Sequence, residues 1–264
     1  MKIFSSLMLV VIGYANAIAQ QTGKDPLISQ SITGSFKETK VRTSGGSITV
    51  NAISEGSARV EVYVQENNGR QKLSEAELKE RLGELYDLEI DVKNDVLHAV
   101  AKPKDKIKDW KKALSISFKI YVPAKTNTDL STSGGSIHLS GLTGKQDFST
   151  SGGSLYLETL AGNIRGRTSG GSIHLKDCKE DIDLRTSGGS IEAKRCEGRI
   201  ALHTSGGSIA LKDLKGDIRT STSGGSVEGK TISGDLTAHT SGGSIHFEEL
   251  SGSLEASTSG GGIR

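Results

Sequence analysis

The chain has 264 residues, of which 34 are glycine, 3 proline and 2 cysteine, and only 4% are aromatic. So much glycine with so little proline excludes collagen, and the mixed charge is not that of a disordered acidic or basic chain. Because 33 Lys and Arg nearly balance 31 Asp and Glu, the formal net charge is +2. This balance indicates no nucleic acid partner.

The N-terminus has the features of a secretory signal peptide. Lys2 precedes an apolar run over residues 3–14, and residues 15–19 offer small-x-small cleavage sites. We expect cleavage to remove residues 1–19. The apolar run is shorter than the roughly 20 residues of a membrane helix, so we expect no transmembrane anchor. The predicted location is outside the cytoplasm, in the periplasm, on the outer-membrane surface or in the medium.

The segment over residues 20–130 has no regular period and reads as an N-terminal β-rich cap with a first coil. Residues 60–64, 85–92, 96–101 and 114–122 are predicted strands. Ser74 and Glu77 fit a capping box, which predicts one short helix with Leu78 and Leu82 on its apolar face. An isolated Thr-Ser-Gly-Gly copy at Thr43 can form the first coil, with the helix inserted after it. Such a cap closes one end of a repeat array.

A strict repeat fills residues 131–264. Thr-Ser-Gly-Gly recurs every 18 residues, and glycine recurs every nine, with Glu180 as the exception. Its tandem copies start at Thr132, Thr150, Thr168, Thr186, Thr204, Thr222, Thr240 and Thr258.

Each nonamer predicts one short strand with a buried face. Apolar residues mostly stand two and four positions after the glycine, as in Ile137 and Leu139. Because such strands bury little alone, they must stack, which predicts an all-β, parallel β-solenoid (β-helix-like) with 18-residue coils. We expect the paired glycines to form a corner with positive φ, and the threonines to face inward as a hydroxyl ladder. The final coil is expected to present an open edge to a partner or a second copy.

These features resemble a family of exported bacterial β-strand-repeat proteins of unknown function, labelled "putative adhesins". The resemblance is carried by the Thr-Ser-Gly-Gly-Ser-Ile repeats, the early copy over residues 42–48 and the segment Ile120-Tyr121-Val122-Pro123. It implies a right-handed parallel β-helix-like fold and an envelope location. It implies no catalytic residues.

Three other functions of glycine-rich or helical β repeats are less well supported. A calcium β-roll needs aspartate in its turns, whereas Asp181, Asp217 and Asp235 occur singly and irregularly. Ice binding needs outward threonines. A carbohydrate-active enzyme could use paired carboxylates such as Asp217 and Asp235, but nothing interrupts the repeat to form a cleft. His138 and His174 share a column about 10 Å apart, too far for one metal ion. We therefore expect no enzyme, metal or cofactor.

Cys178 and Cys196 occupy the same inward site in adjacent coils. A Cα spacing of about 4.8 Å allows a disulfide, and an oxidising compartment favours one. Two buried thiols that act as small apolar side chains fit the pattern equally well.

Two basic features are candidate contacts for a polyanion or glycan. Lys176, Lys194, Lys212 and Lys230 are predicted to form one outward column. Lys102, Lys104, Lys106, Lys108, Lys111 and Lys112 surround the only tryptophan, Trp110. The sequence thus favours a non-enzymatic, adhesin-like module that binds a glycan or an envelope protein. The alternatives are a periplasmic scaffold that assembles as a homo-oligomer through the C-terminal coil, and, more weakly, a carbohydrate-active β-helix enzyme.

Overall fold

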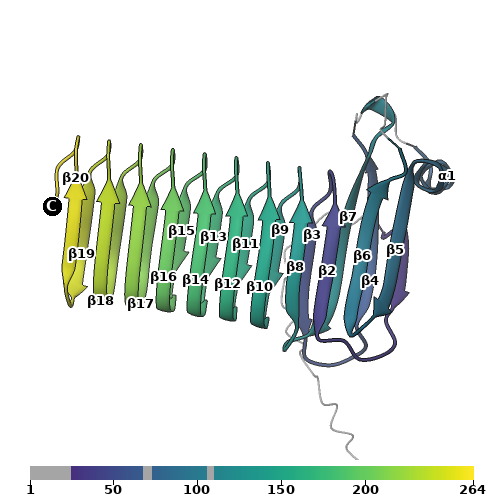
Figure 1. The fold of residues 1–264 in the computed structure, drawn as a ribbon, viewed down its shortest axis with the longest axis horizontal. Helices are drawn as coiled ribbons and strands as arrows, with labels where there is room; N and C mark the ends of the chain where they lie inside the picture. The colour runs from purple at the N-terminus through teal and green to yellow at the C-terminus, as the bar shows by residue number, and fades with distance from the viewer. Residues whose placement is uncertain (1–24, 68–72, 106–109) are drawn as a thin grey trace, which may run out of the picture.

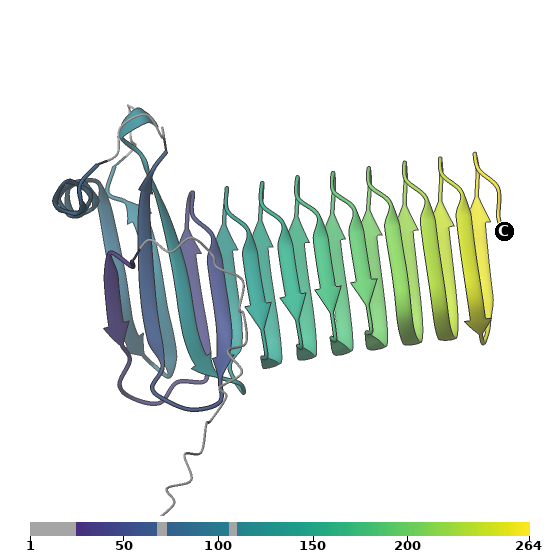
Figure 2. The same cartoon turned by 180° about the vertical axis from the view of Figure 1, so that it is seen from behind.

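The protein is a long β-solenoid with a β-rich cap at its N-terminal end (Figures 1 and 2). The computed structural model describes residues 25–67, 73–105 and 110–264. The predicted signal peptide, Lys106 and Lys108 lie outside the described residues, as does the side chain of Trp110. Among the described residues, no helix is long and apolar enough to cross a membrane.

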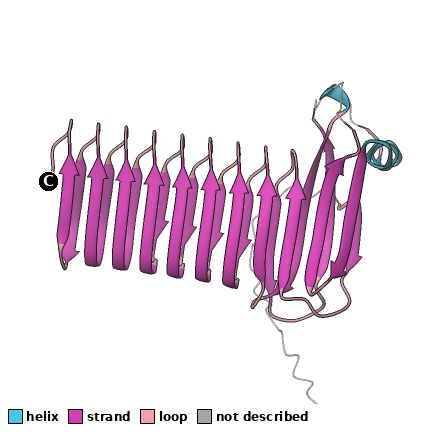
Figure 3. Ribbon diagram, viewed as in Figure 1, coloured by secondary structure: helices cyan, strands magenta, loops and turns pink. Residues whose placement is uncertain are grey.

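Nearly all of the regular structure is strand (Figure 3). The N-terminal part contains β1 (Ile28–Ser31), β2 (Glu38–Thr43), β3 (Ile48–Ile53), β4 (Arg59–Glu66), α1 (Glu75–Leu85), β5 (Tyr86–Lys93), β6 (Val96–Pro103), η1 (Trp110–Lys112) and β7 (Leu114–Pro123). The tandem coils contain β8 (Asn127–Thr132), β9 (Ile137–Ser140), β10 (Thr143–Thr150), β11 (Leu155–Glu158), β12 (Ala161–Thr168), β13 (Ile173–Lys176), β14 (Lys179–Thr186), β15 (Ile191–Lys194), β16 (Glu197–Thr204), β17 (Ile209–Thr222), β18 (Val227–Thr240), β19 (Ile245–Ser251) and β20 (Leu254–Thr258).

Each coil contributes one strand to each of two facing parallel sheets. The threonine sheet contains the strands that end at the repeat threonines, and the lysine sheet contains the strands that follow the glycine pairs. Pairing runs from residue i to residue i+18 throughout, for example Thr150 to Thr168 to Thr186. The long strands β17 and β18 follow the chain from the lysine sheet into the threonine sheet. The predicted 18-residue coil is confirmed.

The isolated copy at Thr43 forms a coil of the same stack. Strands β2 and β3 pair with β8 and β9, so that Thr43 lies beside Thr132 although the two residues are 89 positions apart in the sequence. On their other side, β2 and β3 pair with β6 and β7. The β2–β3 coil is therefore not the outermost layer at the N-terminal end, because β6 and β7 lie between it and the rest of the cap.

The cap ends both sheets with antiparallel strands. Strand β4 pairs with β7, and β1 with β4, while β5 pairs with β6. Helix α1 leads into β5 and begins with the predicted capping box between Ser74 and Glu77. A hydrogen bond from the Ser74 hydroxyl lowers the pKa of Glu77. The buried side chain of Leu82 packs helix α1 against the core of the cap.

The core lies between the two sheets and consists of the predicted inward positions. Ile137, Leu139 and Leu142 are at most 1% exposed, and most of their equivalents along the stack repeat this burial until the last coil, where Leu250 is exposed. The repeat threonines are also buried, as predicted. Their hydroxyls, however, donate to backbone rather than to one another. Thr186 Oγ1, for example, donates to the Gly171 carbonyl at 2.7 Å.

The serine after each glycine pair supplies the hydroxyl ladder instead. The Ser172 amide donates to Ser154 Oγ at 3.1 Å, and the Ser190 amide donates to Ser172 Oγ at 3.3 Å. In addition to the backbone pairing, one threonine hydrogen bond and one serine hydrogen bond thus link each coil to the next. The Thr-Ser-Gly-Gly-Ser motif therefore forms the corner of each coil.

The expectation of positive φ at the paired glycines is wrong. At these corners, which lie entirely within the described ranges, no paired glycine has φ in the left-handed region. The second glycine is required because a Cβ there would overlap the backbone of the preceding coil, as at Gly171 over Gly153. Positive φ occurs at the opposite corner, for example at Asp177 (57°) and Gly198 (123°).

Candidate binding surface

The outward side of the lysine sheet, here called the lysine face, carries the predicted lysine column. Lys176 pairs in register with Lys194, Lys194 with Lys212, and Lys212 with Lys230. The column continues to Glu158 at one end and to Glu248 at the other. The strands therefore place the four lysines in one row, as predicted.

Carboxylates neutralise the two ends of this row. Lys176 Nζ lies 2.6 Å from Glu158 Oε1, and Lys230 Nζ lies 3.2 Å from Glu248 Oε2. The hydrogen bond from Lys230 lowers the pKa of Glu248. Within the described part of the chain, Lys194 and Lys212 have no ion pair. The predicted stripe of four cations is thus reduced to two unpaired ones at its centre.

A stack of three rings lies beside this row on the same face. The Tyr156 ring is sandwiched between His138 and His174, with centroids 4.5 and 5.1 Å apart. Burial lowers the pKa of His138, which favours the neutral imidazole. His174 Nδ1 lies 3.3 Å from Glu192 Oε2. The two histidines were predicted to share a column, whereas Tyr156 was not singled out, although it lies 18 residues from each of them.

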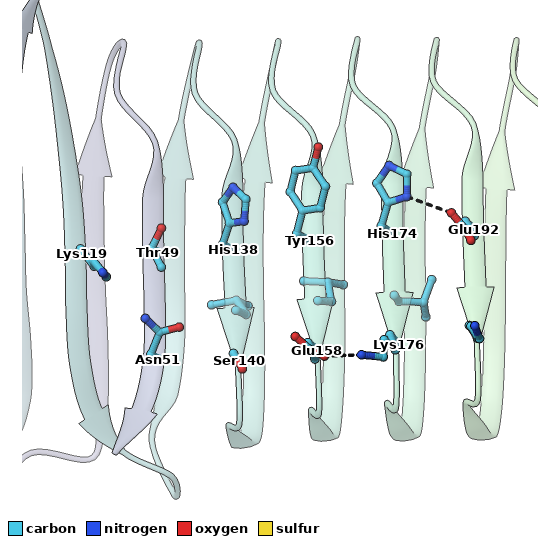
Figure 4. A pocket seen from close by; sticks show the side chains of 14 residues that line it. Thr49, Asn51, Lys119, His138, Ser140, Tyr156, Glu158, His174, Lys176 and Glu192 are labelled. Carbon is cyan, nitrogen blue, oxygen red and sulfur yellow. Dashed lines mark hydrogen bonds and ion pairs between the residues drawn. The ribbon is translucent and has the colours of Figure 1, made fainter. Parts of the chain in front are cut away.

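A shallow groove of about 620 Å³ runs along these side chains (Figure 4). It extends from Lys119 and Thr49 at the cap to Glu192 and Lys194. A second groove of about 460 Å³ begins at Glu192 and Lys194 and continues past Lys212 to Lys230. The lysine face therefore offers one extended surface with Lys194 at its middle.

The basic loop of the cap is not part of this surface in the described residues. Lys104 Nζ donates to the Gly83 carbonyl at 2.6 Å, so it is tied to helix α1. Lys111 and Lys112 belong to η1, which Trp110 begins. The predicted role of the Trp110 side chain stays a prediction.

The outward side of the threonine sheet has a groove of about 960 Å³ lined by Arg165, Arg167 and Arg185. Arg185 is bonded to Asp183. Arg165 and Arg167 have no ion pair among the described residues. Basic side chains are thus found on both faces, as the sequence indicates, but among the described residues only the lysine face combines them with stacked rings.

The other candidate groups do not form a site. Asp217 and Asp235 are register neighbours, but Asp217 is paired with Arg219 and Asp235 accepts a hydrogen bond from Ser253. The described residues contain no cluster of three or more His, Cys, Asp or Glu that could hold a metal ion.

Cys178 and Cys196 are both buried and free. The hydrogen bond to Cys196 and burial raise the pKa of Cys178, so its thiol is protonated. The cross-coil disulfide stays a prediction, which intact mass under non-reducing conditions can test.

Comparison with known proteins shows the fold. No family model matches the chain, and no curated protein matches it. Among solved structures, a "putative adhesin" from Parabacteroides merdae matches with a TM-score of 0.53 and 15% identity, covering 90% of this chain and 95% of that one. A "putative adhesin" from Parabacteroides distasonis matches with a TM-score of 0.51 and 16% identity, covering 89% and 95%. A third from Bacteroides fragilis has a TM-score of 0.47 and 17% identity, covering 89% and 94%.

Proposed function

We propose that this chain is an exported, non-enzymatic binding module of the adhesin type, which holds an acidic polysaccharide on its lysine face. Lys194 and Lys212 carry the proposal. They are adjacent in register and form no ion pair among the described residues. Two ammonium groups on neighbouring rungs, about 4.8 Å apart at the backbone, repel each other. A bound anionic chain relieves that repulsion.

Other observations support the same function. The tandem coils follow one another without insertion, so the chain offers long surfaces rather than an enclosed cleft. The N-terminal segment has the order of charge, apolar run and small residues that is typical of exported proteins. The fold matches proteins named "putative adhesins".

A charge-reversal experiment tests the lysine face. A glycan array identifies acidic ligands, and polygalacturonate binding is then measured by calorimetry, with neutral dextran as the uncharged control. We expect the variant Lys194→Glu with Lys212→Glu to lose about tenfold or more in affinity, or about 1.4 kcal/mol. Binding by the native protein should weaken between low and moderate salt because the contacts are ionic.

The matched control reverses two exposed lysines elsewhere, Lys125→Glu with Lys179→Glu, and so changes the net charge equally. It should keep affinity within about twofold of the native protein. Equal weakening in both variants would mean that only net charge matters and would overturn the lysine face. Release of new reducing ends from the bound polysaccharide would contradict the non-enzymatic assignment.

Protease treatment of intact cells tests the location. A copy with a cleavable tag is exposed to protease, with a periplasmic protein as control. Cleavage on intact cells supports a surface role. Cleavage only after the outer membrane is opened supports a periplasmic one, and adhesion to outside surfaces is then excluded.

A scaffold role has one observation in its favour. Of the four large apolar side chains that the described residues expose, Leu250, Leu254 and Ile263 belong to the last coil. Strand β20 pairs with β18 on one side only. If this edge joins two copies, sedimentation should show association that rises with concentration and is lost on Leu254→Lys. A monomer at all concentrations would exclude it.

A further inference from the structure

At the cap end of the lysine face, small side chains interrupt the outward columns. Lys119 pairs in register with Thr49, and Thr49 with His138. In the neighbouring column, Asn51 pairs with Ser140. We call this feature the junction slot: its floor is Thr49, Asn51 and Ser140, and its walls are Lys119 and His138 (Figure 4).

The floor of the junction slot is polar and unused. All three floor side chains are half-buried, and among the described residues none of them makes a hydrogen bond. Other polar side chains in the same columns are engaged, as in Glu158 with Lys176 and His174 with Glu192. The slot therefore presents an amide and two hydroxyls to whatever enters it.

One face of the His138 ring is open to the slot. Tyr156 covers the other face at 4.5 Å. Lys119 and His138 lie in the same column two rungs apart, a distance of about 10 Å, with only the small Thr49 between them. That width admits one ring at van der Waals distance, about 3.5–4.0 Å, from the imidazole.

The chemistry of the slot matches a sugar ring. An aromatic face attracts the weakly positive C–H groups on one side of a pyranose. Amide and hydroxyl side chains match its ring hydroxyls. Lys119 lines the groove and has no ion pair among the described residues; its Nζ lies 5.5 Å from the centroid of the Tyr121 ring, so it adds a cation at that end. The second unpaired cation of this groove, Lys194, is about 24 Å away along the stack.

We infer that the junction slot binds one pyranose ring of an acidic glycan, whose chain continues along the lysine face toward Lys194. The C–H side of the ring lies on His138, its hydroxyls bond to Asn51 and Ser140, and its carboxylate faces Lys119. This inference rests on the proposed function. It adds that the cap end of the lysine face recognises the shape of a sugar ring as well as its charge.

The test uses short oligogalacturonates and calorimetry on the whole chain. We expect Asn51→Ala with Ser140→Ala, and separately His138→Ala, each to lower affinity about tenfold. Because the removed groups are uncharged or favour the neutral form, the dependence of affinity on salt should be unchanged. Lys194→Glu with Lys212→Glu should instead reduce that dependence. His239→Ala, an outward histidine on the threonine sheet, serves as the matched control and should bind normally.

The possible results separate the two proposals. If no oligogalacturonate binds to the native protein, the proposed function and the slot fail together. If binding depends on Lys194 and Lys212 but not on Asn51, Ser140 or His138, the slot alone is overturned. Thermal melts show whether each variant is folded, and a shift of the His138 ring signals in NMR spectra on adding ligand provides a second measurement that needs no variant. Unshifted signals at saturation would overturn the slot.

Discussion

Glu180 stands in a column of the stack that is otherwise glycine. Its φ is 80°, in the left-handed region, whereas its neighbours Gly162 and Gly198 have 111° and 123°. A side chain costs roughly 1–2 kcal/mol in that region, and glycine's extra freedom in the unfolded chain offsets part of the gain. We therefore expect Glu180→Gly to raise the free energy of unfolding by about 1 kcal/mol, measured by urea denaturation.

Lys179 provides the matched control for this change. It is the adjacent exposed residue and has no positive φ. Lys179→Gly should lower stability by about 0.5–1 kcal/mol, since glycine weakens a strand. If both variants shift stability in the same direction, left-handed strain at Glu180 is not the cause.

The His138 imidazole should titrate below its ordinary pKa of 6.5, because burial disfavours the charged ring. Between the lowered pKa and 6.5, the unfolded chain holds a proton that the folded chain lacks. Stability from this group is therefore present above pH 6.5 and falls as the pH drops below it. NMR titration of the ring signals, folded and in urea, measures both values.

Removal of the covering ring tests the cause of this shift. In Tyr156→Ala, His138 loses the ring stacked on it at 4.5 Å, and its pKa should move up toward 6.5. An unchanged pKa would show that groups other than Tyr156 desolvate the imidazole.

At the scale of strands, large and small inward residues compensate between adjacent coils. Phe148 of β10 pairs in register with Gly166 of β12, where a Cβ would overlap the Phe148 ring. Further along the same column, Leu184 pairs with Leu202. Gly229 and Phe247 repeat the exchange in the other sheet. A Phe–Gly pair and a Leu–Leu pair thus fill a similar space between adjacent coils.

A double-mutant cycle measures this compensation. Gly166→Leu alone should cost about 1–3 kcal/mol, because the Phe148 ring already occupies the space. Phe148→Leu alone should leave a cavity over Gly166 and cost about 1–3 kcal/mol. The double variant restores the Leu–Leu pair and should cost less than the sum by at least 1 kcal/mol. Additive costs would mean that the two positions relax independently.

The strands and their stacking could be predicted because both depend on spacing. The 18-residue period places Thr132 and Thr150 in one column, and the shared Thr-Ser-Gly-Gly motif indicates that Thr43 belongs there too. The roles of the glycines could not be predicted in the same way. A recurring glycine indicates that a side chain is disfavoured at that position. Two different causes have this effect, a positive φ and a neighbouring backbone too close for a Cβ. The structure shows that Gly171 is required by a close backbone and Gly198 by its positive φ.

The binding surface was predicted only in part for a similar reason. The lysine column follows from spacing, but its neutralisation depends on Glu158 and Glu248, which lie one coil beyond its ends. The junction slot brings Lys119 and Thr49 together from different parts of the cap. Since no period relates those two residues, sequence spacing alone does not place them.

For the whole molecule, the coil is the unit of construction, so deleting one coil should leave a shorter but intact protein. Residues 187–204 comprise β15 and β16, and their removal joins Thr186 to Ser205 with every remaining pair still 18 residues apart in register. Because each coil contacts only its neighbours, the free energy of unfolding should fall only by the contribution of one coil and one interface between coils. We expect cooperative thermal unfolding and an unchanged strand signal per residue in circular dichroism.

Removal of half a coil should be far more damaging. Without residues 187–195, Thr186 is followed directly by Cys196, and the strand that should enter the lysine sheet is lost. The strands on the two sides of the deletion are then no longer spaced by 18 residues. A strand of the threonine sheet would have to pair with a strand of the lysine sheet, whose inward residues differ. This variant should be aggregated or lack a cooperative melt. If the two deletions are equally stable, the two-sheet coil is not the folding unit, and the long continuous face on which glycan binding depends would need another explanation.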